Sequence, residues 1–309
     1  MELIDRYRGA LMGLAVGDAL GVPLEFRIPG SFKPVTEMIG GGAFRLRPGQ
    51  WTDDTSMALC LAESLIVKKG FDPVDQLERY VHWWKDGHMS STGDCFDIGN
   101  GTKMALMTFE RERLPYSGSM NPKHGGNGSV MRLAPVPMLY ALKPEDAIER
   151  SGESSRTTHG SPGCIDGCRY LGAIIVGALN GTSKEDLLSE RFCPVPDYWE
   201  RKPLMNEIDR VARGSFKHSD PPFIQATGYV VKTLEAALWA FNRTDNFRDG
   251  CLMAVNLGDD ADTVGAVYGQ IAGAFYGLGG IPESWRDLIH QKEMILGFAD
   301  KLYDHSRTI

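Results

Sequence analysis

The sequence predicts an all-α fold, and three observations support this prediction. Ten segments carry apolar residues at spacings of three and four, which is the period of a helix with one buried face. No stretch of four to eight residues alternates cleanly between apolar and polar side chains, as a half-buried strand would. The polar connections rich in Gly and Pro are too short to separate two cores. We therefore expect one all-α domain over residues 1–309.

The expected helices follow this periodicity in chain order. Because 42% of the residues are hydrophobic, a chain of 309 residues can bury one face of each helix in a sizeable core. The segments with helical periodicity span residues 3–20, 56–67, 74–84, 104–109, 130–142, 165–179, 228–241, 247–256, 264–278 and 285–302.

Charge and cysteine usage exclude several classes of protein. The balance of 33 Lys and Arg against 40 Asp and Glu gives a net charge of −7, and no window is densely basic. This argues against nucleic acid or an anionic membrane as the main partner. The six cysteines match no zinc or disulfide pattern, and no apolar run reaches the ~18 residues of a membrane span. We expect reduced thiols, no membrane anchor and a cytoplasmic location.

Two expected helices carry a glycine at every fourth position. A glycine inside a helix costs about 1 kcal/mol relative to alanine, so a stripe of four requires a compensating gain. Close approach to a neighbouring helix is the usual gain, which places both helices deep in the bundle. The two stripes consist of Gly9, Gly13, Gly17 and Gly21, and of Gly265, Gly269, Gly273 and Gly277.

Two acidic sequences lie at the starts of helical segments. We call residues 51–55 (Trp-Thr-Asp-Asp-Thr) the first acidic knot and residues 258–263 (Gly-Asp-Asp-Ala-Asp-Thr) the second acidic knot. One carboxylate is enough to cap a helix, yet each knot has more than one. If these charges converge at about 4 Å, each pair repels by about 4 kcal/mol at an effective dielectric constant near 20. A shared divalent cation would remove that cost, and two separate helix caps are the alternative.

The side chains in and near the knots form a ligand set made only of oxygen. Hard oxygen ligands favour Mg²⁺, Mn²⁺ or Ca²⁺ over Zn²⁺, and a set of this size is large enough for two ions about 3.5–4 Å apart. The candidate ligands are the carboxylates of Glu25, Asp53, Asp54, Asp260 and Asp262 and the hydroxyls of Thr52 and Thr263.

Two glycine-rich loops precede helical segments. Residues 124–129 (His-Gly-Gly-Asn-Gly-Ser) run directly into the apolar segment that starts at Val130, and residues 99–102 (Gly-Asn-Gly-Thr) have the same character. The backbone N–H groups of such a loop and of a helix N-terminus can hold a phosphate, although ordinary turns have the same composition. His159 precedes another helix and either contacts a ligand or caps that helix.

Five motifs, in this order, resemble the ADP-ribosylglycohydrolase family. They are residues 13–21, the first acidic knot, residues 126–132, the pair Thr158-His159 and the second acidic knot. Residues 96–100 and 228–239 resemble its bacterial branch of dinitrogenase reductase-activating glycohydrolases. The resemblance covers nearly the whole chain. It implies a compact orthogonal helical bundle with a binuclear Mg²⁺ or Mn²⁺ centre that releases ADP-ribose from a modified side chain.

The resemblance also implies roles for single residues. The implied metal ligands are Thr52, Asp53, Asp54, Asp260, Asp262 and Thr263, with Glu25 as a mobile ligand or gate. The implied catalytic carboxylates are Asp97, Glu25 and Asp54. The implied contacts to ADP-ribose are Gly99, Asn100, Gly126, Asn127, Gly128, Ser129 and His159, together with Tyr229, which falls where the bacterial branch stacks an aromatic ring near the ligand.

The implied reaction is hydrolysis of the bond between ADP-ribose and arginine through an oxocarbenium-like state, with Asp97 transferring a proton. The partners would be an ADP-ribosylated protein or small molecule and the ADP-ribose product, and we expect a monomer. Two alternatives share every motif. One is a hydrolase of another ADP-ribose linkage, to serine, a nucleic acid base or a small molecule. The other is a non-catalytic relative that binds ADP-ribose or only packs.

Overall fold

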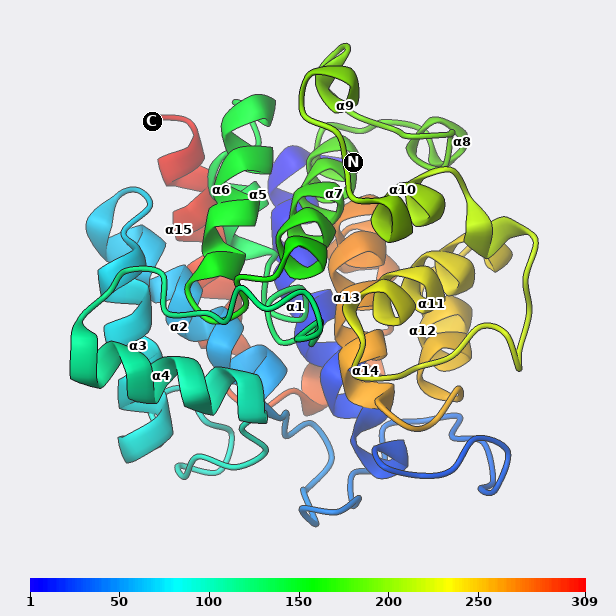
Figure 1. The fold of residues 1–309 in the computed structure, drawn as a ribbon. Helices are drawn as coiled ribbons and strands as arrows, with labels where there is room; N and C mark the ends of the chain where they lie inside the picture. Colours follow the sequence, from blue (N-terminus) through cyan, green and yellow to red (C-terminus); the bar gives the residue numbers. More distant parts are fainter.

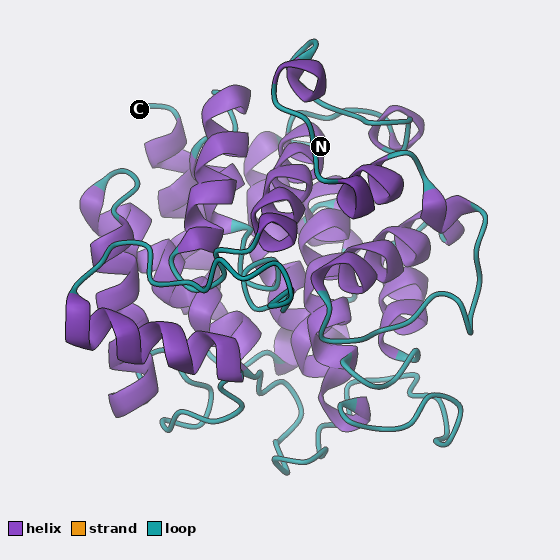
Figure 2. Cartoon of the chain, viewed as in Figure 1, coloured by secondary structure: helices purple, strands orange, loops and turns teal.

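The computed structural model describes residues 1–309, and it is all-α, as predicted (Figures 1 and 2). Its only β pairings are two isolated bridges, Gly41 with Leu46 and Gly126 with Tyr229. No helix combines the length and the apolar character that a membrane crossing requires. The helices are α1 Leu3–Gly21, α2 Asp53–Lys68, α3 Pro73–Asp86, α4 Asn100–Glu112, α5 Pro135–Leu139, α6 Pro144–Arg156, α7 Pro162–Leu179, α8 Lys184–Leu187, α9 Tyr198–Arg201, α10 Asn206–Ala212, α11 Val230–Arg243, α12 Phe247–Val255, α13 Ala261–Tyr276, α14 Glu283–Leu288 and α15 Lys292–Ser306, with short 3₁₀ turns η1 Val22–Leu24, η2 Ser215–Lys217 and η3 Leu278–Gly280.

The two glycine-striped helices, α1 and α13, pack against each other at the centre of the bundle (Figure 1). A Cβ atom built on Gly13 would lie 2.3 Å from the carbonyl oxygen of Gly269, and one on Gly17 would lie 1.9 Å from that of Gly265. The stripes therefore face one another in antiparallel order, with backbone against backbone. The prediction that both helices lie deep in the bundle is confirmed, and this close approach is the gain that offsets the glycines.

The glycine contact also positions the acidic residues. At the C-terminal end of α1, a Cβ on Gly21 would lie 2.4 Å from the Cα of Asp262, at the start of α13. The chain then continues through η1 to Glu25, which is buried. Because the two helices are antiparallel, the end of α1 and the beginning of α13 bring Glu25 and Asp262 to the same end of the bundle.

One cluster of 82 buried hydrophobic residues runs through the helices, from Tyr7 in α1 to Leu302 in α15. On the basis of this shared core, we propose that residues 1–309 form one domain.

The helix expected over residues 130–142 is wrong for most of its length. Only α5 is helical there, because Pro135 and Pro137 lack a backbone N–H and fix φ. The preceding residues form turns whose backbone groups are satisfied by Gln270 of α13. The Gln270 side chain donates to the carbonyls of Val130 and Met131, at 3.1 and 2.7 Å, and accepts from a backbone N–H at 2.8 Å.

Three short helices, α8, α9 and α10, have no counterpart among the expected segments, and two other regions also differ from the expected helices. The segment 285–302 is split into α14 and α15. Helix α14 ends at Leu288, and in the connection that follows the N–H of His290 donates to the carbonyl of Gly49 at 3.0 Å. Helix α6 has no counterpart among the expected segments. Its buried face holds only two apolar residues, Ala147 and Ile148, beside serines and a glycine, so counting apolar positions misses it.

Candidate active site

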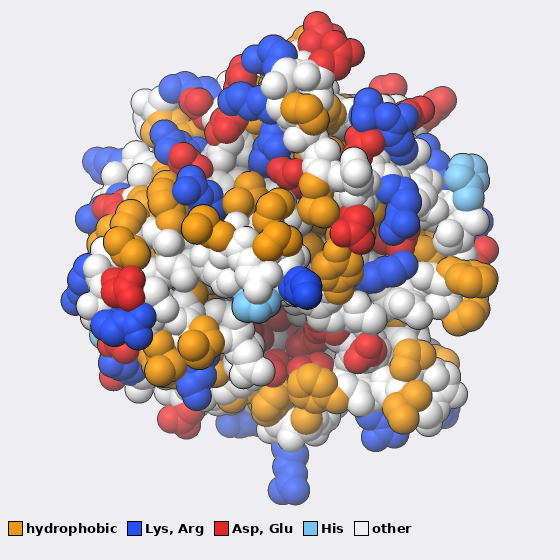
Figure 3. Space-filling model, in the orientation of Figure 1, with side chains coloured by type: hydrophobic (Ala, Val, Ile, Leu, Met, Phe, Trp, Pro, Cys, Tyr) orange, Lys and Arg blue, Asp and Glu red, His pale blue; other side chains and the backbone are white.

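A cavity of about 790 Å³ opens where the first residues of α2, α4 and α13 meet the loops around residues 25–26, 124–128 and 158–159. In the space-filling view, acidic side chains form the floor of a hollow in this face of the molecule (Figure 3). Six of the 25 lining residues are Asp or Glu, and none is Lys or Arg. The acidic residues are Glu25, Asp53, Asp97, Asp259, Asp260 and Asp262.

The first acidic knot is held by Asp18 of α1. One Asp18 oxygen accepts from the N–H and the hydroxyl of Thr52, at 2.9 and 3.0 Å, and the other accepts from Thr55. Thr52, the N-terminal flanking residue of α2, makes no capping bond with its own side chain. Asp18 therefore caps α2 from a neighbouring helix, and the adjacent carboxylates, Asp53 and Asp54, are not used as caps.

The two acidic knots meet through Thr52. Its hydroxyl lies 3.2 Å from Oδ2 of Asp262 and 3.4 Å from Oδ2 of Asp54, so it joins α2 to α13. In the second knot, Oδ2 of Asp260 accepts from the side-chain amide of Asn127 at 2.6 Å. The hydroxyl of Thr263 lies 3.5 Å from Oδ2 of Asp54. The structure thus brings all seven candidate metal ligands to one end of the bundle, whereas separate helix caps would lie apart.

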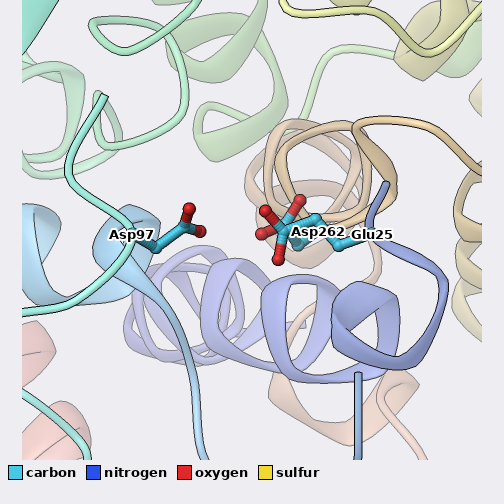
Figure 4. A group of neighbouring side chains, drawn as sticks. All are labelled: Glu25, Asp97 and Asp262. Atoms are coloured by element: carbon cyan, nitrogen blue, oxygen red, sulfur yellow. The ribbon is translucent and has the colours of Figure 1, made fainter. Parts of the chain in front are cut away.

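Asp97 lies outside both knots in the sequence but joins them in space. One carboxylate oxygen from each of Glu25, Asp97 and Asp262 lies within 4.8 Å of the other two. Figure 4 shows Asp97 on the loop before α4, with its carboxylate directed toward Glu25 and Asp262. The Asp97 backbone has φ of +57°, a left-handed conformation that a non-glycine residue rarely adopts. Such strain occurs most often at functional sites.

Burial and mutual repulsion raise the pKa of these carboxyl groups. Burial, and then repulsion from Asp97, raise the pKa of Glu25 to about 10. Burial likewise raises the pKa of Asp97 to about 7, and it raises the pKa values of Asp53, Asp54 and Asp262 well above their ordinary range. The cluster cannot hold its full charge at neutral pH unless cations compensate it.

The donor set fits divalent cations. Oε2 of Glu25 and Oδ1 of Asp54 are buried and have no hydrogen-bond partner in the protein. Buried carboxylate oxygens without a donor are rare, because their desolvation is uncompensated. With no Lys or Arg lining the cavity, a hard cation is the compensation that this all-oxygen cluster fits best.

Two glycine-rich stretches of backbone form another part of the cavity wall. Gly99 and Asn100 lie at the start of α4, and Gly126, Asn127 and Gly128 lie in the loop beside it. The expected helix N-terminus after Ser129 does not exist, since turns occupy residues 128–132. The anion site predicted there would rely on loop N–H groups, whereas the loop before α4 does meet a helix of 13 residues.

Not every predicted site residue lines the cavity. Thr52 and Asp54 are fully or almost fully buried behind it. The Ser129 hydroxyl accepts from that of Ser155 at 2.9 Å, inside the protein. The ring of Tyr229 packs against Gly125, and its hydroxyl donates to Glu207 at 2.8 Å, outside the lining.

Asp18 is the clearest residue that the candidate ligand set omits. The sequence does indicate a role for Asp18, because it is a carboxylate inside an apolar helix and next to Gly17 of the glycine stripe. It is fully buried, and burial raises its pKa to about 6. The wall formed by Met104, Ala105 and Thr108 was also not predicted, and it has no sequence signal beyond helical periodicity.

A family model described as ADP-ribosylglycohydrolase matches residues 1–308. The chain belongs to the ADP-ribosylglycohydrolase family. This confirms the resemblance drawn from the five motifs.

Curated relatives and a solved structure agree with the family assignment. The ADP-ribosylarginine hydrolase Tri1 of Serratia proteamaculans is 43% identical over 302 residues, which cover 98% of this chain and 80% of that protein. The ADP-ribosyl-dinitrogen reductase glycohydrolase of Rhodospirillum rubrum is 32% identical over 296 residues, covering 93% and 91%. A solved structure titled as an ADP-ribosylglycohydrolase-related protein complex matches with a TM-score of 0.87 at 43% identity, covering 99% of each chain.

Proposed function

We propose that this chain is a hydrolase that removes ADP-ribose from arginine side chains and depends on divalent metal ions. The observation that carries the proposal is the cavity, which combines six carboxyl groups, no Lys or Arg and two stretches of glycine-rich backbone. The names of the two family relatives support it, since one is an ADP-ribosylarginine hydrolase and the other a glycohydrolase of ADP-ribosylated dinitrogen reductase.

Two Mg²⁺ or Mn²⁺ ions would be held by the oxygen ligands of the two knots. When bound, such ions supply Lewis acidity that orients ribose hydroxyls and stabilises charge in the transition state. The mutual contacts of Thr52, Asp54 and Asp262 support this assignment, as do the buried oxygens that have no protein donor. The proposed ligands are Thr52, Asp53, Asp54, Asp260, Asp262, Thr263 and Glu25.

The diphosphate of ADP-ribose would lie on the glycine-rich backbone. The backbone N–H groups of Gly99 and Asn100 stand at the N-terminus of α4, where the helix dipole favours an anion. Gly126 and Gly128 have no side chains, which leaves room for the diphosphate at the opposite wall. His159 lies between this loop and the start of α4. The position of the diphosphate next to the acidic end would set the ribose over the carboxylates.

The hydrolysis needs one proton acceptor close to the sugar. Water contributes its oxygen to the anomeric carbon, and we assign its proton to Asp97, whose carboxyl group faces Glu25 and Asp262 across the cavity (Figure 4). The electrons of the broken carbon–nitrogen bond leave with the guanidino nitrogen, which takes up a proton. The products are unmodified arginine and free ADP-ribose, with one water consumed.

The charge of the cavity favours arginine over serine as the linked side chain. A guanidinium group is cationic, and the carboxylate of Asp97 at the cavity wall, which is not among the proposed metal ligands, would orient it through charge-assisted hydrogen bonds. A serine hydroxyl carries no charge and would leave this carboxylate without a matching group.

The proposal is tested by comparing two defined substrates with the same enzyme. ADP-ribosylarginine and ADP-ribosylserine peptides of otherwise identical sequence are incubated with the enzyme and Mn²⁺ or Mg²⁺, and free ADP-ribose is quantified. We expect release from the arginine peptide and little from the serine peptide. Equal or faster release from serine contradicts the assignment to arginine, and no release from either contradicts hydrolase activity.

A further inference from the structure

Arg132 is a buried cation without a carboxylate partner. Its side chain is fully buried, and no Asp or Glu forms an ion pair with it. Instead, its guanidinium donates to the carbonyl of Gly128 at 2.6 Å and to the hydroxyls of Thr157 and Thr158 at 3.2 and 2.7 Å. It also stacks over the ring of Tyr80, 4.7 Å from the ring centroid. An unpaired buried charge is costly, so its contacts call for an explanation.

The hydroxyl of Thr158 links Arg132 to His159. Its oxygen accepts from Arg132, and its other hydrogen-bond partner is Nδ1 of His159 at 2.8 Å. A guanidinium has no acceptor, and no other acceptor contacts this hydroxyl in the structure, so donation to Nδ1 is the arrangement that gives the single hydroxyl proton of Thr158 a partner. This arrangement leaves Nδ1 unprotonated and places the ring proton on Nε2.

The Nε2 edge of His159 faces the glycine-rich wall of the cavity. Cβ atoms built on Gly101 and Gly128 would each lie 3.1 Å from Nε2, and one on Gly126 would lie 3.4 Å from it. No protein atom accepts a hydrogen bond from Nε2, and His159 lines the cavity. Burial and the charge of Arg132 lower the pKa of His159 to about 3, so the ring is neutral in the physiological range.

We infer that Thr158, held by Arg132, is a positioning residue that fixes His159 as the Nε2–H tautomer, so that the ring presents one donor to a phosphate or ribose oxygen of ADP-ribose. The same guanidinium holds the carbonyl of Gly128, so the glycine loop and the imidazole donor are set by one side chain. The identity of the ligand rests on the proposed function, but the tautomer does not.

Thr157 provides a matched control for Thr158. Both threonines are buried at the same end of α6, and both hydroxyls accept from Arg132, but only Thr158 contacts His159. The Thr157 hydroxyl instead donates to the carbonyl of Ser154 at 2.7 Å. Replacing either residue with valine removes one hydroxyl and preserves shape, whereas Thr158→Ser keeps the hydroxyl.

The tautomer is measured by ¹⁵N NMR of histidine-labelled, metal-free protein, with the His159 signals assigned by their loss in His159→Gln. We expect Nε2–H in the wild-type protein, in Thr157→Val and in Thr158→Ser, and a mixture of tautomers in Thr158→Val. In Arg132→Lys we also expect a mixture, because one ammonium group cannot reproduce both the Gly128 and the Thr158 contact. An Nδ1–H tautomer in the wild-type protein, or an unchanged tautomer in Thr158→Val, overturns the inference.

The functional consequence is measured as the affinity for ADP-ribose by calorimetry in the presence of Mg²⁺. Thr158→Val should raise the dissociation constant by about two- to ten-fold, the inverse of the fraction of molecules that keep the Nε2–H tautomer, while Thr157→Val and Thr158→Ser leave it nearly unchanged. Equal losses in the two valine variants contradict a specific role for Thr158. If the wild-type protein binds no ADP-ribose, the proposed function fails, and the NMR result still decides the tautomer.

Discussion

Asp18 accepts two hydrogen bonds from Thr52, one from its backbone N–H at 2.9 Å and one from its hydroxyl at 3.0 Å. Through this pair, a carboxylate on α1 fixes the first turn of α2 and orients a hydroxyl that also lies 3.2 Å from Asp262. Asp18 thus acts behind the proposed metal ligands, as outer-shell carboxylates commonly do.

We expect Asp18→Asn to remain folded and to weaken Mn²⁺ binding by about 10- to 100-fold, the usual effect of losing an outer-shell partner. Each Asp18 oxygen accepts from one threonine, Thr52 or Thr55. An asparagine has only one acceptor oxygen, so its NH₂ group would face the donors of the other threonine. Calorimetry measures the affinity. Asp146→Asn, at the exposed start of α6, is the control for the loss of one charge. Equal Mn²⁺ affinity in Asp18→Asn and the wild-type protein contradicts the role assigned to Asp18.

A second prediction concerns the glycine contact between α1 and α13. A Cβ on Gly17 would lie 1.9 Å from the carbonyl oxygen of Gly265, so Gly17→Ala should lower the free energy of unfolding by about 1–3 kcal/mol or more. Gly297 of α15 has no atom near its Cβ position, so Gly297→Ala should raise that free energy by roughly 0.5–1 kcal/mol. Denaturant unfolding of both variants measures the difference. Two changes of the same sign are incompatible with this packing.

The raised pKa values predict how the stability of the metal-free protein depends on pH. The pKa of Glu25 is about 10 in the folded protein, and that of Asp97 is about 7, well above the ordinary carboxyl values of the unfolded chain. Between those values and the folded ones, the folded state binds more protons than the unfolded state. The free energy of unfolding therefore falls as pH rises, and the stabilisation is complete only below the unfolded pKa values.

We expect the melting temperature of the metal-free protein to fall between pH 7 and 9. The slope should be roughly 2–4 °C per pH unit if Glu25 contributes one proton. Glu25→Gln should reduce that slope, and saturating Mn²⁺ should stabilise the protein more at pH 8 than at pH 6, because the ligands bind the metal deprotonated. His159 does not contribute to this slope above about pH 7, because a group with a folded pKa of about 3 and an ordinary value of 6.5 changes the stability only between those two values. A melting temperature that rises with pH would refute the charged cluster.

Asp97→Asn tests the proton-transfer role. Removal of a general base typically lowers the rate about 10²- to 10⁴-fold, so we expect kcat for ADP-ribosylarginine to fall by that much. Affinity for ADP-ribose should change far less, because the carboxamide preserves the shape of the residue. Single-turnover kinetics and calorimetry separate these effects. Normal turnover by Asp97→Asn removes this residue from the chemical step.

Much of the fold could be predicted because apolar periodicity and the glycine stripes report burial directly. The exceptions have specific physical causes. Residues 130–134 depend on Gln270, which is more than 130 positions away in the sequence and satisfies their backbone groups. Helix α6 buries serines, which do not register as apolar. Long-range hydrogen bonds of this kind have no signature in a local sequence window.

The sequence predicts the part of the candidate site in which several acidic residues lie close together in the chain. It does not predict residues that only position another side chain. Six of the seven oxygen ligands lie in the two short knots and the seventh is Glu25, and the structure brings them together where α1 ends and α13 begins. Asp18 and Arg132 are not among the predicted site residues, because each acts through a neighbouring side chain. The threonines that they contact lie between 25 and 37 positions away in the sequence. Tyr229 and Ser129 were assigned by resemblance, and neither lines the cavity.

The most direct test of the proposed metal centre is to measure turnover as metal is added. Metal-free enzyme receives increasing Mn²⁺ while release of ADP-ribose from an ADP-ribosylarginine peptide is followed, with bound metal counted by mass spectrometry. We expect no turnover in excess chelator and a rate that saturates at two ions per chain. Asp260→Asn and Asp262→Asn should retain a helical circular-dichroism spectrum and lose most of the activity. Full turnover in excess chelator, or in both of these variants, would contradict the proposed metal centre.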